Sequence, residues 1–211
     1  MAQARDALEL IDISYEPLPA VTDLVAATEA GAPQVWDAAP GNVCFSLAMG
    51  DKAATEAAFA KAAHSVKLRL EKNRLAPAPM EPRGAIGAYD AGTDTYTLYS
   101  SIQNPHGVRA LLARTVLHIP ETRLRVVGPD VGGGFGMKGD VYPEDALVLL
   151  AARQCGRPVK WIASRSESFL SDDYGRDQIV EAEMALDGDG RILAMRANAL
   201  HKLGAYVVGA A

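Results

Sequence analysis

A run of closely spaced glycines constrains this chain more than any other feature of its sequence. Four of the five residues at 132–136 are glycine, and Gly139 follows shortly after. An alternating apolar run precedes the segment, and a helix-forming run that opens with Pro143 follows it. Glycine loses the most conformational entropy on folding, so this density requires positive φ angles or a close approach of backbone N–H groups to a ligand. The segment therefore predicts a special turn between a strand and a helix.

The glycines by themselves leave several interpretations open. Residues 134–139 formally match the GxGxxG pattern of dinucleotide-binding folds. However, the last glycine precedes Pro143 by four residues, and the acidic residue expected about 20 positions further on has only Glu167 as a late substitute. Lys138 lacks the spacing and the following Ser or Thr of a P-loop. A nucleotide-binding loop, a purely structural turn and the wall of another cofactor site all remain as alternatives.

Hydrophobic patterning and turn residues predict a mixture of helices and strands. Asn104 is a good N-cap before Pro105, and the sequence Asp187–Gly190 is a hairpin signal between two alternating runs. The expected helices cover 52–63, 105–119 and 143–154, and the expected strands cover 8–16, 64–75, 85–90, 95–101, 123–128, 159–164 and the two runs within 178–200.

The order of these elements predicts the fold class. A strand–helix–strand unit over 123–164 implies a right-handed parallel crossover, whereas the hairpins beside it are antiparallel. The sheet is therefore expected to be mixed, with helices, in an α+β fold. Residues 22–50 are rich in Gly and Pro among short apolar pieces, which predicts a long connection and a domain boundary near residue 50.

Composition excludes some classes of function. A net charge of -5 without a basic patch argues against nucleic acid binding, and the absence of a run of about 18 apolar residues argues against a membrane span. The N-terminal residues lack the apolar core of a signal peptide. Cys44 and Cys155 have no metal-binding spacing, so both are expected to be buried thiols in a reducing cytoplasm.

An ordered series of motifs covers nearly the whole chain and includes MEPRGAIGAYD, SSIQNPHGVR, VGPDVGGGFGMKGD and GDGRILAMRANAL. This series resembles the molybdenum-binding large subunits of the xanthine dehydrogenase, aldehyde oxidase and aerobic carbon monoxide dehydrogenase family. The resemblance implies the α+β molybdopterin-binding domain of this family. Residues 1–50 would be the end of a preceding small domain with a connecting segment. Residues 51–211 would be the first part of the cofactor-binding domain, incomplete at its C-terminus.

The resemblance also implies roles for five residues in cofactor binding. The side-chain amide of Gln103 would hydrogen-bond an oxygen ligand of molybdenum, although it could instead cap the helix that follows. Gly133, Gly134, Phe135 and Gly136 would place their backbone against the molybdenum ligands and the pterin, whereas Phe135 would otherwise be a core aromatic residue. No residue of this chain would ligate the metal directly. The catalytic glutamate of the family would lie in a C-terminal part that this sequence lacks.

The family further implies the chemistry and the partners. The cofactor would be molybdopterin with molybdenum, in the cytosine dinucleotide form usual in bacteria, with iron–sulfur and FAD groups on partner subunits. The reaction would be the oxidative hydroxylation of an aldehyde, an N-heterocycle or a similar small molecule. Gly139 stands where purine-oxidising members carry a glutamate, which favours a carbon monoxide dehydrogenase-like or generic branch. This chain alone is expected to be inactive, and a small nucleotide-binding module and a non-catalytic scaffold are the alternatives.

Overall fold

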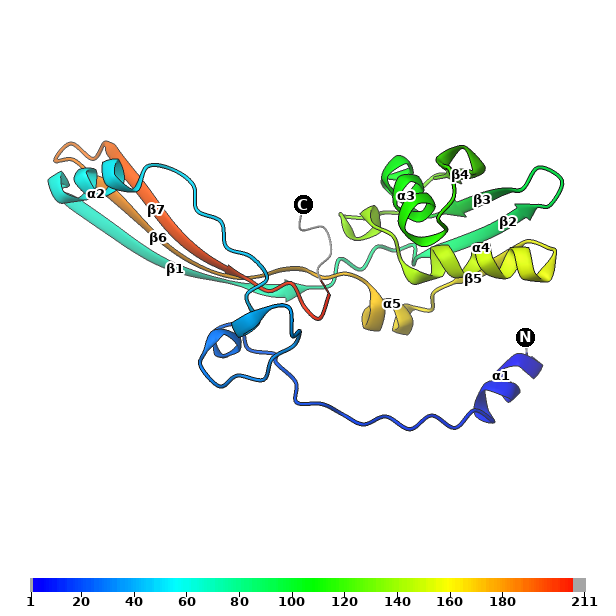
Figure 1. The fold of residues 1–211 in the computed structure, drawn as a ribbon. Helices are drawn as coiled ribbons and strands as arrows, with labels where there is room; N and C mark the ends of the chain where they lie inside the picture. Colours follow the sequence, from blue (N-terminus) through cyan, green and yellow to red (C-terminus); the bar gives the residue numbers. More distant parts are fainter. Residues whose placement is uncertain (1, 207–211) are drawn as a thin grey trace. The chain divides into compact units, whose positions relative to one another are not determined.

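The structure is a computed structural model that describes residues 2–206 (Figure 1). The chain divides into two compact units. One unit comprises Lys67–Ala182 and the residues from Ala197 on, and the other comprises the residues up to Val66 and Glu183–Arg196.

The larger unit contains a mixed four-stranded sheet. Its strands β2 (Gly84–Asp90), β3 (Thr95–Ser100), β4 (Leu124–Val127) and β5 (Val159–Ile162) have the spatial order β4-β3-β2-β5. Strand β2 pairs antiparallel with both β3 and β5, whereas β3 pairs parallel with β4. The mixed sheet and the hairpin of β2 and β3 confirm the predicted α+β class.

Helices connect the strands of this sheet that run in the same direction. Helix α3 (Pro105–Leu111) continues into a π-helical turn at Leu112–Val116 and joins β3 to β4, while α4 (Pro143–Cys155) joins β4 to β5. Because β4 and β5 both run opposite to β2, the predicted parallel direction of the unit over 123–164 is confirmed. The two strands are not neighbours, however, since β3 and β2 lie between them.

The core of this unit lies between the sheet and its two helices. Leu98 on β3, Val108 on α3 and Leu149 on α4 are almost completely buried in one apolar cluster. Helix α4 lies along β2 and β5 (Figure 1). The approach is so close that a Cβ atom at Gly87 would lie 2.3 Å from the carbonyl oxygen of Val148. Glycine on β2 is therefore a packing requirement.

A second sheet has the strand order β1-β6-β7, with residues divided between both units. It comprises β1 (His64–Leu75), β6 (Gly175–Leu186) and β7 (Ile192–His201), and α2 (Lys52–Lys61) precedes β1. The predicted hairpin is present, because the backbone N–H of Asp187 donates to the carbonyl oxygen of Arg191. Apolar residues alternate along β1, a pattern typical of a half-buried strand. Instead, all its side chains are exposed in the part of the chain that the structure describes.

Three local expectations are corrected by the structure. Residues 8–16 were expected to form a strand, but α1 (Ala2–Glu9) is followed by an irregular segment. A lone strand leaves its backbone groups unpaired, and alternation without a partner strand does not stabilise one. The helix α5 (Arg165–Ser171) was not expected, although a capping box of Ser164 and Glu167 marks its start. Cys44 and Cys155 are both exposed free thiols and not buried ones.

The segment between α1 and α2 is mostly irregular. Two short 3-10 turns, η1 (Ala26–Thr28) and η2 (Pro40–Asn42), are the helical elements described there. None of the helices within residues 2–206 has the length and apolar character needed to cross a membrane.

Candidate cofactor-binding site

The residues 132–139, here called the glycine loop, follow a backbone path that few side chains tolerate. Gly133 and Gly136 both have φ of 92°, and Phe135 between them has φ of 54°. Positive φ is readily accessible to glycine but costs free energy for a residue with a Cβ atom. Positive φ angles, one of the two causes expected from the sequence, therefore account for glycine at 133 and 136. Phe135 is held in a strained conformation.

Gln103 lies directly against this loop. Its backbone N–H donates to the carbonyl oxygen of Lys138 at 2.9 Å, and its side-chain Oε1 accepts from the N–H of Gly136 at 3.0 Å. A Cβ atom at Gly134 would lie 2.3 Å from the same Oε1. The structure thus brings together all five residues predicted to bind the cofactor.

The capping role considered for Gln103 belongs to its neighbour. The side-chain Oδ1 of Asn104 accepts from the N–H of Gly107 at 3.0 Å in the first turn of α3. Gln103 is therefore left to contact the glycine loop, and its side chain is exposed.

Several hydrogen-bond donors at the loop have no acceptor among the described residues. They are the Nε2 group of Gln103 and the consecutive backbone N–H groups of Gly133, Gly134 and Phe135. Phe135 is 75% exposed, so it is not the core aromatic residue considered from the sequence. Unpaired donors beside an exposed aromatic ring suit a planar, oxygen-rich ligand, because the donors bind its oxygen atoms and the ring packs against its face. The residues present therefore fit the cofactor that the resemblance implies.

A buried lysine joins the glycine loop to two other segments. The Nζ of Lys138 donates to the carbonyl oxygen of Glu81 at 2.9 Å, to its Oε2 at 3.0 Å, and to the Oγ of Ser101 at 2.7 Å. The Oε2 of Glu81 also accepts from Ser101 Oγ and from the N–H of Gly132, both at 2.7 Å. The side chain of Lys138 is 0% exposed and that of Glu81 is 40% exposed.

The environment of Glu81 keeps this carboxyl group ionised. Partial burial by itself raises its pKa, but hydrogen bonds from Ser101, Lys138 and the N–H of Gly132 outweigh that effect. The charge of Lys138 acts in the same direction, so the pKa of Glu81 is lowered from its ordinary value. From the sequence, Lys138 was considered only as a P-loop residue. No local pattern pairs two residues 57 positions apart.

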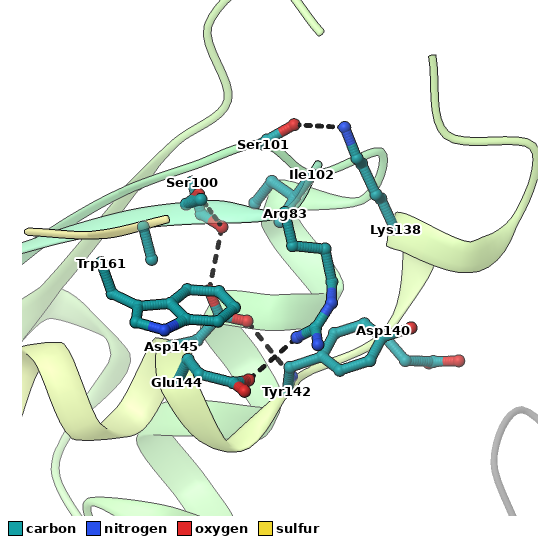
Figure 2. A pocket seen from close by; sticks show the side chains of 12 residues that line it. Arg83, Ser100, Ser101, Ile102, Lys138, Asp140, Tyr142, Glu144, Asp145 and Trp161 are labelled. Carbon is teal, nitrogen blue, oxygen red and sulfur yellow. Dashed lines mark hydrogen bonds and ion pairs between the residues drawn. The ribbon is translucent and has the colours of Figure 1, made fainter. Parts of the chain in front are cut away.

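A second polar cluster surrounds Arg83 (Figure 2). The guanidinium of Arg83 donates to Asp172 Oδ1 at 2.7 Å and to Glu144 Oε2 at 2.9 Å, and it lies 3.6 Å from the ring centre of Tyr142. Burial raises the pKa of the Tyr142 hydroxyl, which donates to the carbonyl oxygen of Met137 at 2.8 Å. The Arg83 cluster thus connects the starts of β2 and α4 with the end of α5, and it contacts the glycine loop through the Tyr142 hydroxyl.

The cavity in this cluster is too small for a substrate or a cofactor. Its volume is about 10 Å³, the space of a single water molecule. Figure 2 shows the side chains of Arg83, Tyr142 and Asp145 around it. Within residues 2–206, no group of three or more His, Cys, Asp or Glu residues is placed to hold a metal ion.

Comparison with known proteins identifies the family. Residues 35–211 match the family model of the molybdopterin cofactor-binding domain. The chain belongs to this family.

Similar proteins are molybdenum enzymes of several specificities. The chain is 35% identical to the carbon monoxide dehydrogenase large chain of Hydrogenophaga pseudoflava, over 96% of this chain and 27% of that protein. It is 36% identical to the nicotine 6-hydroxylase large subunit of Paenarthrobacter nicotinovorans, over 97% of this chain and 25% of that protein. The crystal structure of a Cu,Mo-containing carbon monoxide dehydrogenase superposes with a TM-score of 0.84 at 34% identity, covering 93% of this chain and 26% of that one.

These matches confirm the predicted family and fold. The chain is a molybdopterin-binding domain of the type found in molybdenum hydroxylases, and it spans about a quarter of the length of these relatives. Neither the nucleotide-binding module nor the scaffold alternative finds support in these matches.

Proposed function

We propose that this chain forms one wall of the molybdopterin site in the large subunit of a molybdenum hydroxylase. The subunit would oxidatively hydroxylate an aldehyde, an N-heterocycle or a similar small molecule. The observation that carries the proposal is the set of unpaired donors at residues 133–135 and on Gln103, beside the exposed ring of Phe135. The family match and the oxidoreductase relatives support it.

The proposed roles of the site residues follow from their contacts. Because the Oε1 of Gln103 accepts from the N–H of Gly136, its Nε2 group is turned outward as a donor for an oxygen ligand of molybdenum. The backbone of Gly133, Gly134 and Phe135 would contact the pterin and the metal ligands. The bound cofactor supplies the oxidative chemistry, whereas these residues orient it. We assign no catalytic base to this chain.

The larger assembly is proposed from the relatives. Several of them are named as large chains or large subunits, which supports partner subunits that carry iron–sulfur and FAD groups. We propose the cytosine dinucleotide form of the cofactor, residues 1–50 as the end of a preceding domain with its connection, and 51–211 as the first part of the cofactor-binding domain. The free thiols of Cys44 and Cys155 suit a location in the reducing cytoplasm.

The substrate branch is proposed from Gly139. A glutamate at this position in purine-oxidising members contacts the substrate, whereas Gly139 has no side chain, and a Cβ atom placed there would meet nothing within 4 Å. We therefore favour the carbon monoxide dehydrogenase-like or generic aldehyde and N-heterocycle branch over a purine substrate.

The test is to purify the tagged protein from its native host, together with the chains that accompany it. Metal and pterin analysis should find molybdenum and a pterin dinucleotide, and the preparation should reduce an artificial electron acceptor with an aldehyde or an N-heterocycle. A fully assembled, cofactor-replete preparation without molybdenum would overturn the proposal. Micromolar binding of NAD or ATP by that preparation, lost on changing the glycine loop, would instead favour a nucleotide-binding module.

A further inference from the structure

We infer that Lys138 is a positioning residue for the cofactor site. Its ammonium group, held by Glu81 and Ser101, would fix the glycine loop and the Gln103 amide in the geometry that receives the cofactor. This inference rests on the proposed function. It concerns a side chain that is 0% exposed and reaches toward Ser101 (Figure 2).

Lys138 holds the segment of Gln103 at two points, one through its backbone and one through its side chain. Its carbonyl oxygen accepts from the N–H of Gln103 at 2.9 Å, and its Nζ donates to the Oγ of Ser101 at 2.7 Å. A displacement of Lys138 therefore moves the backbone of Gln103 and also the loop that carries Gly136, the partner of the Gln103 side chain.

The carboxylate of Glu81 joins both ends of the glycine loop. The Oε2 of Glu81 accepts from the N–H of Gly132 at 2.7 Å and from the Nζ of Lys138 at 3.0 Å. The backbone N–H of Glu81 also donates to the carbonyl oxygen of Gly132 at 3.3 Å. The unpaired donors at residues 133–135 lie between these two attachment points, so their direction depends on both.

The glycine loop contains a strained residue. Phe135 has φ of 54° between two glycines with φ of 92°. A strained residue of this kind keeps its conformation only when the surrounding structure imposes it. The contacts of Lys138 and Glu81 provide that constraint on both sides of Phe135.

Stability alone does not explain the positive charge of the buried Lys138 side chain. A buried ion pair is often no more stabilising than apolar side chains of similar volume. Lys138 uses all three N–H donors of its ammonium group in directional bonds, while its side chain is 0% exposed. An apolar residue would fill the same space without fixing those directions, so the charge is explained by geometry.

The experiment uses the protein purified with its accompanying chains, as wild type and as Lys138→Met. Hydrogen–deuterium exchange of the hydrogen-bonded amides within residues 132–138, which include those of Gly132, Gly136 and Met137, should become about tenfold faster in the variant, because the loop that carries them loses the hydrogen bonds of the Lys138 Nζ. After partial reduction with dithionite, the Mo(V) electron paramagnetic resonance signal should shift in g-values, because the donors around the cofactor are displaced.

A matched control separates positioning from general destabilisation. Leu149→Ala removes a fully buried side chain on α4 that has no part in the loop contacts. This variant should lower the melting temperature yet leave both the exchange of residues 132–138 and the Mo(V) signal as in the wild type. Where Lys138→Met does not fold, Ser101→Ala removes one of the three Nζ acceptors and should give the same changes at smaller amplitude.

Each outcome decides one claim. Unchanged loop exchange in Lys138→Met would overturn the attachment of the loop by Lys138. Faster exchange with an unchanged Mo(V) signal, or equal changes in Leu149→Ala, would overturn the positioning role. Absence of molybdenum from the wild type would overturn the proposed function and, with it, the positioning role of Lys138. The exchange of the loop amides would still show whether Lys138 attaches the glycine loop.

Discussion

At the residue scale, two glycines of the same loop differ sharply in what surrounds them. A Cβ atom at Gly134 would lie 2.3 Å from the Oε1 of Gln103, whereas one at Gly139 would have no neighbour within 4 Å. Gly134→Ala should therefore displace the exposed Gln103 side chain, at a cost of about 1 kcal/mol for its hydrogen bond to Gly136, and reduce the molybdenum content. Gly139→Ala should change the free energy of unfolding by less than about 0.5 kcal/mol. Thermal unfolding with metal analysis checks both, and equal effects would contradict the packing argument.

The ion pair of Glu81 and Lys138 should be asymmetric in its contribution to stability. Removing the Glu81 side chain leaves an ammonium that is 0% exposed without its counter-charge, whereas removing the Lys138 ammonium leaves a carboxylate that is 40% exposed. Glu81→Ala should thus destabilise the protein by about 3 kcal/mol or more, and Lys138→Met by clearly less. Denaturant unfolding of both variants measures the difference, and a larger loss in Lys138→Met would refute the asymmetry.

The sequence predicted the residues proposed to face the cofactor but not the contacts that support them. Gln103, Phe135 and the glycines were predicted because they stand in short motifs that resemble a family. The contacts of Lys138 with Glu81 and Ser101 were not predicted. They depend on three segments brought together by the sheet, and no periodic pattern records which side chains then meet.

At the scale of elements, local signals predicted the helices and strands of the larger unit well. Asn104 and Pro105 mark the start of α3, and Pro143 marks the start of α4, as expected from their capping chemistry. The strand expected at residues 8–16 was wrong because pairing, which alternation does not report, decides whether a strand forms. The short helix α5 was missed because its seven residues carry no apolar period, although its capping box was readable.

The start of α4 carries a pH-dependent contribution to stability. Burial raises the pKa of Asp145 from 3.8, although its carboxylate accepts from the Tyr142 N–H at 3.2 Å and from Ser100 Oγ at 2.9 Å. A raised folded-state pKa means that stability is fully present below the unfolded value and is lost as pH rises through the folded value.

Asp145→Asn should remove this loss while keeping both contacts, since an amide can accept from Tyr142 and donate to Ser100. The melting temperature of the variant relative to wild type should therefore rise as the pH increases above 3.8, because the pKa of Asp145 is shifted upward from that value. Asp145→Ala, which loses both hydrogen bonds, should instead cost about 1–3 kcal/mol at neutral pH. If the difference in melting temperature between Asp145→Asn and the wild type does not change with pH, the proposed effect of burying the Asp145 carboxylate is wrong.

At the scale of the whole molecule, the second sheet presents apolar side chains that the described residues leave exposed. Val66, Leu68 and Leu70 on β1, and Ile192 and Met195 on β7, are each at least 42% exposed. Apolar surface of this kind in a soluble assembly is normally buried by another domain or subunit. Because the chain spans about a quarter of its relatives' length, we expect other parts of the full assembly to cover these strands.

The expectation is tested by comparing the isolated chain with the protein purified alongside its accompanying chains. The isolated chain should bind the dye ANS strongly and exchange the amides of β1 and β7 rapidly, because exposed apolar strands bind the dye and open readily. In the purified assembly the dye signal should fall and these amides should be protected. The amides of β2 and β3 serve as the internal control, because their sheet is completed within the larger unit and should be protected in both preparations. Equal exchange of β1 and β7 in both preparations would show that nothing in the assembly covers them, and the proposed larger subunit would then need a different arrangement around this sheet.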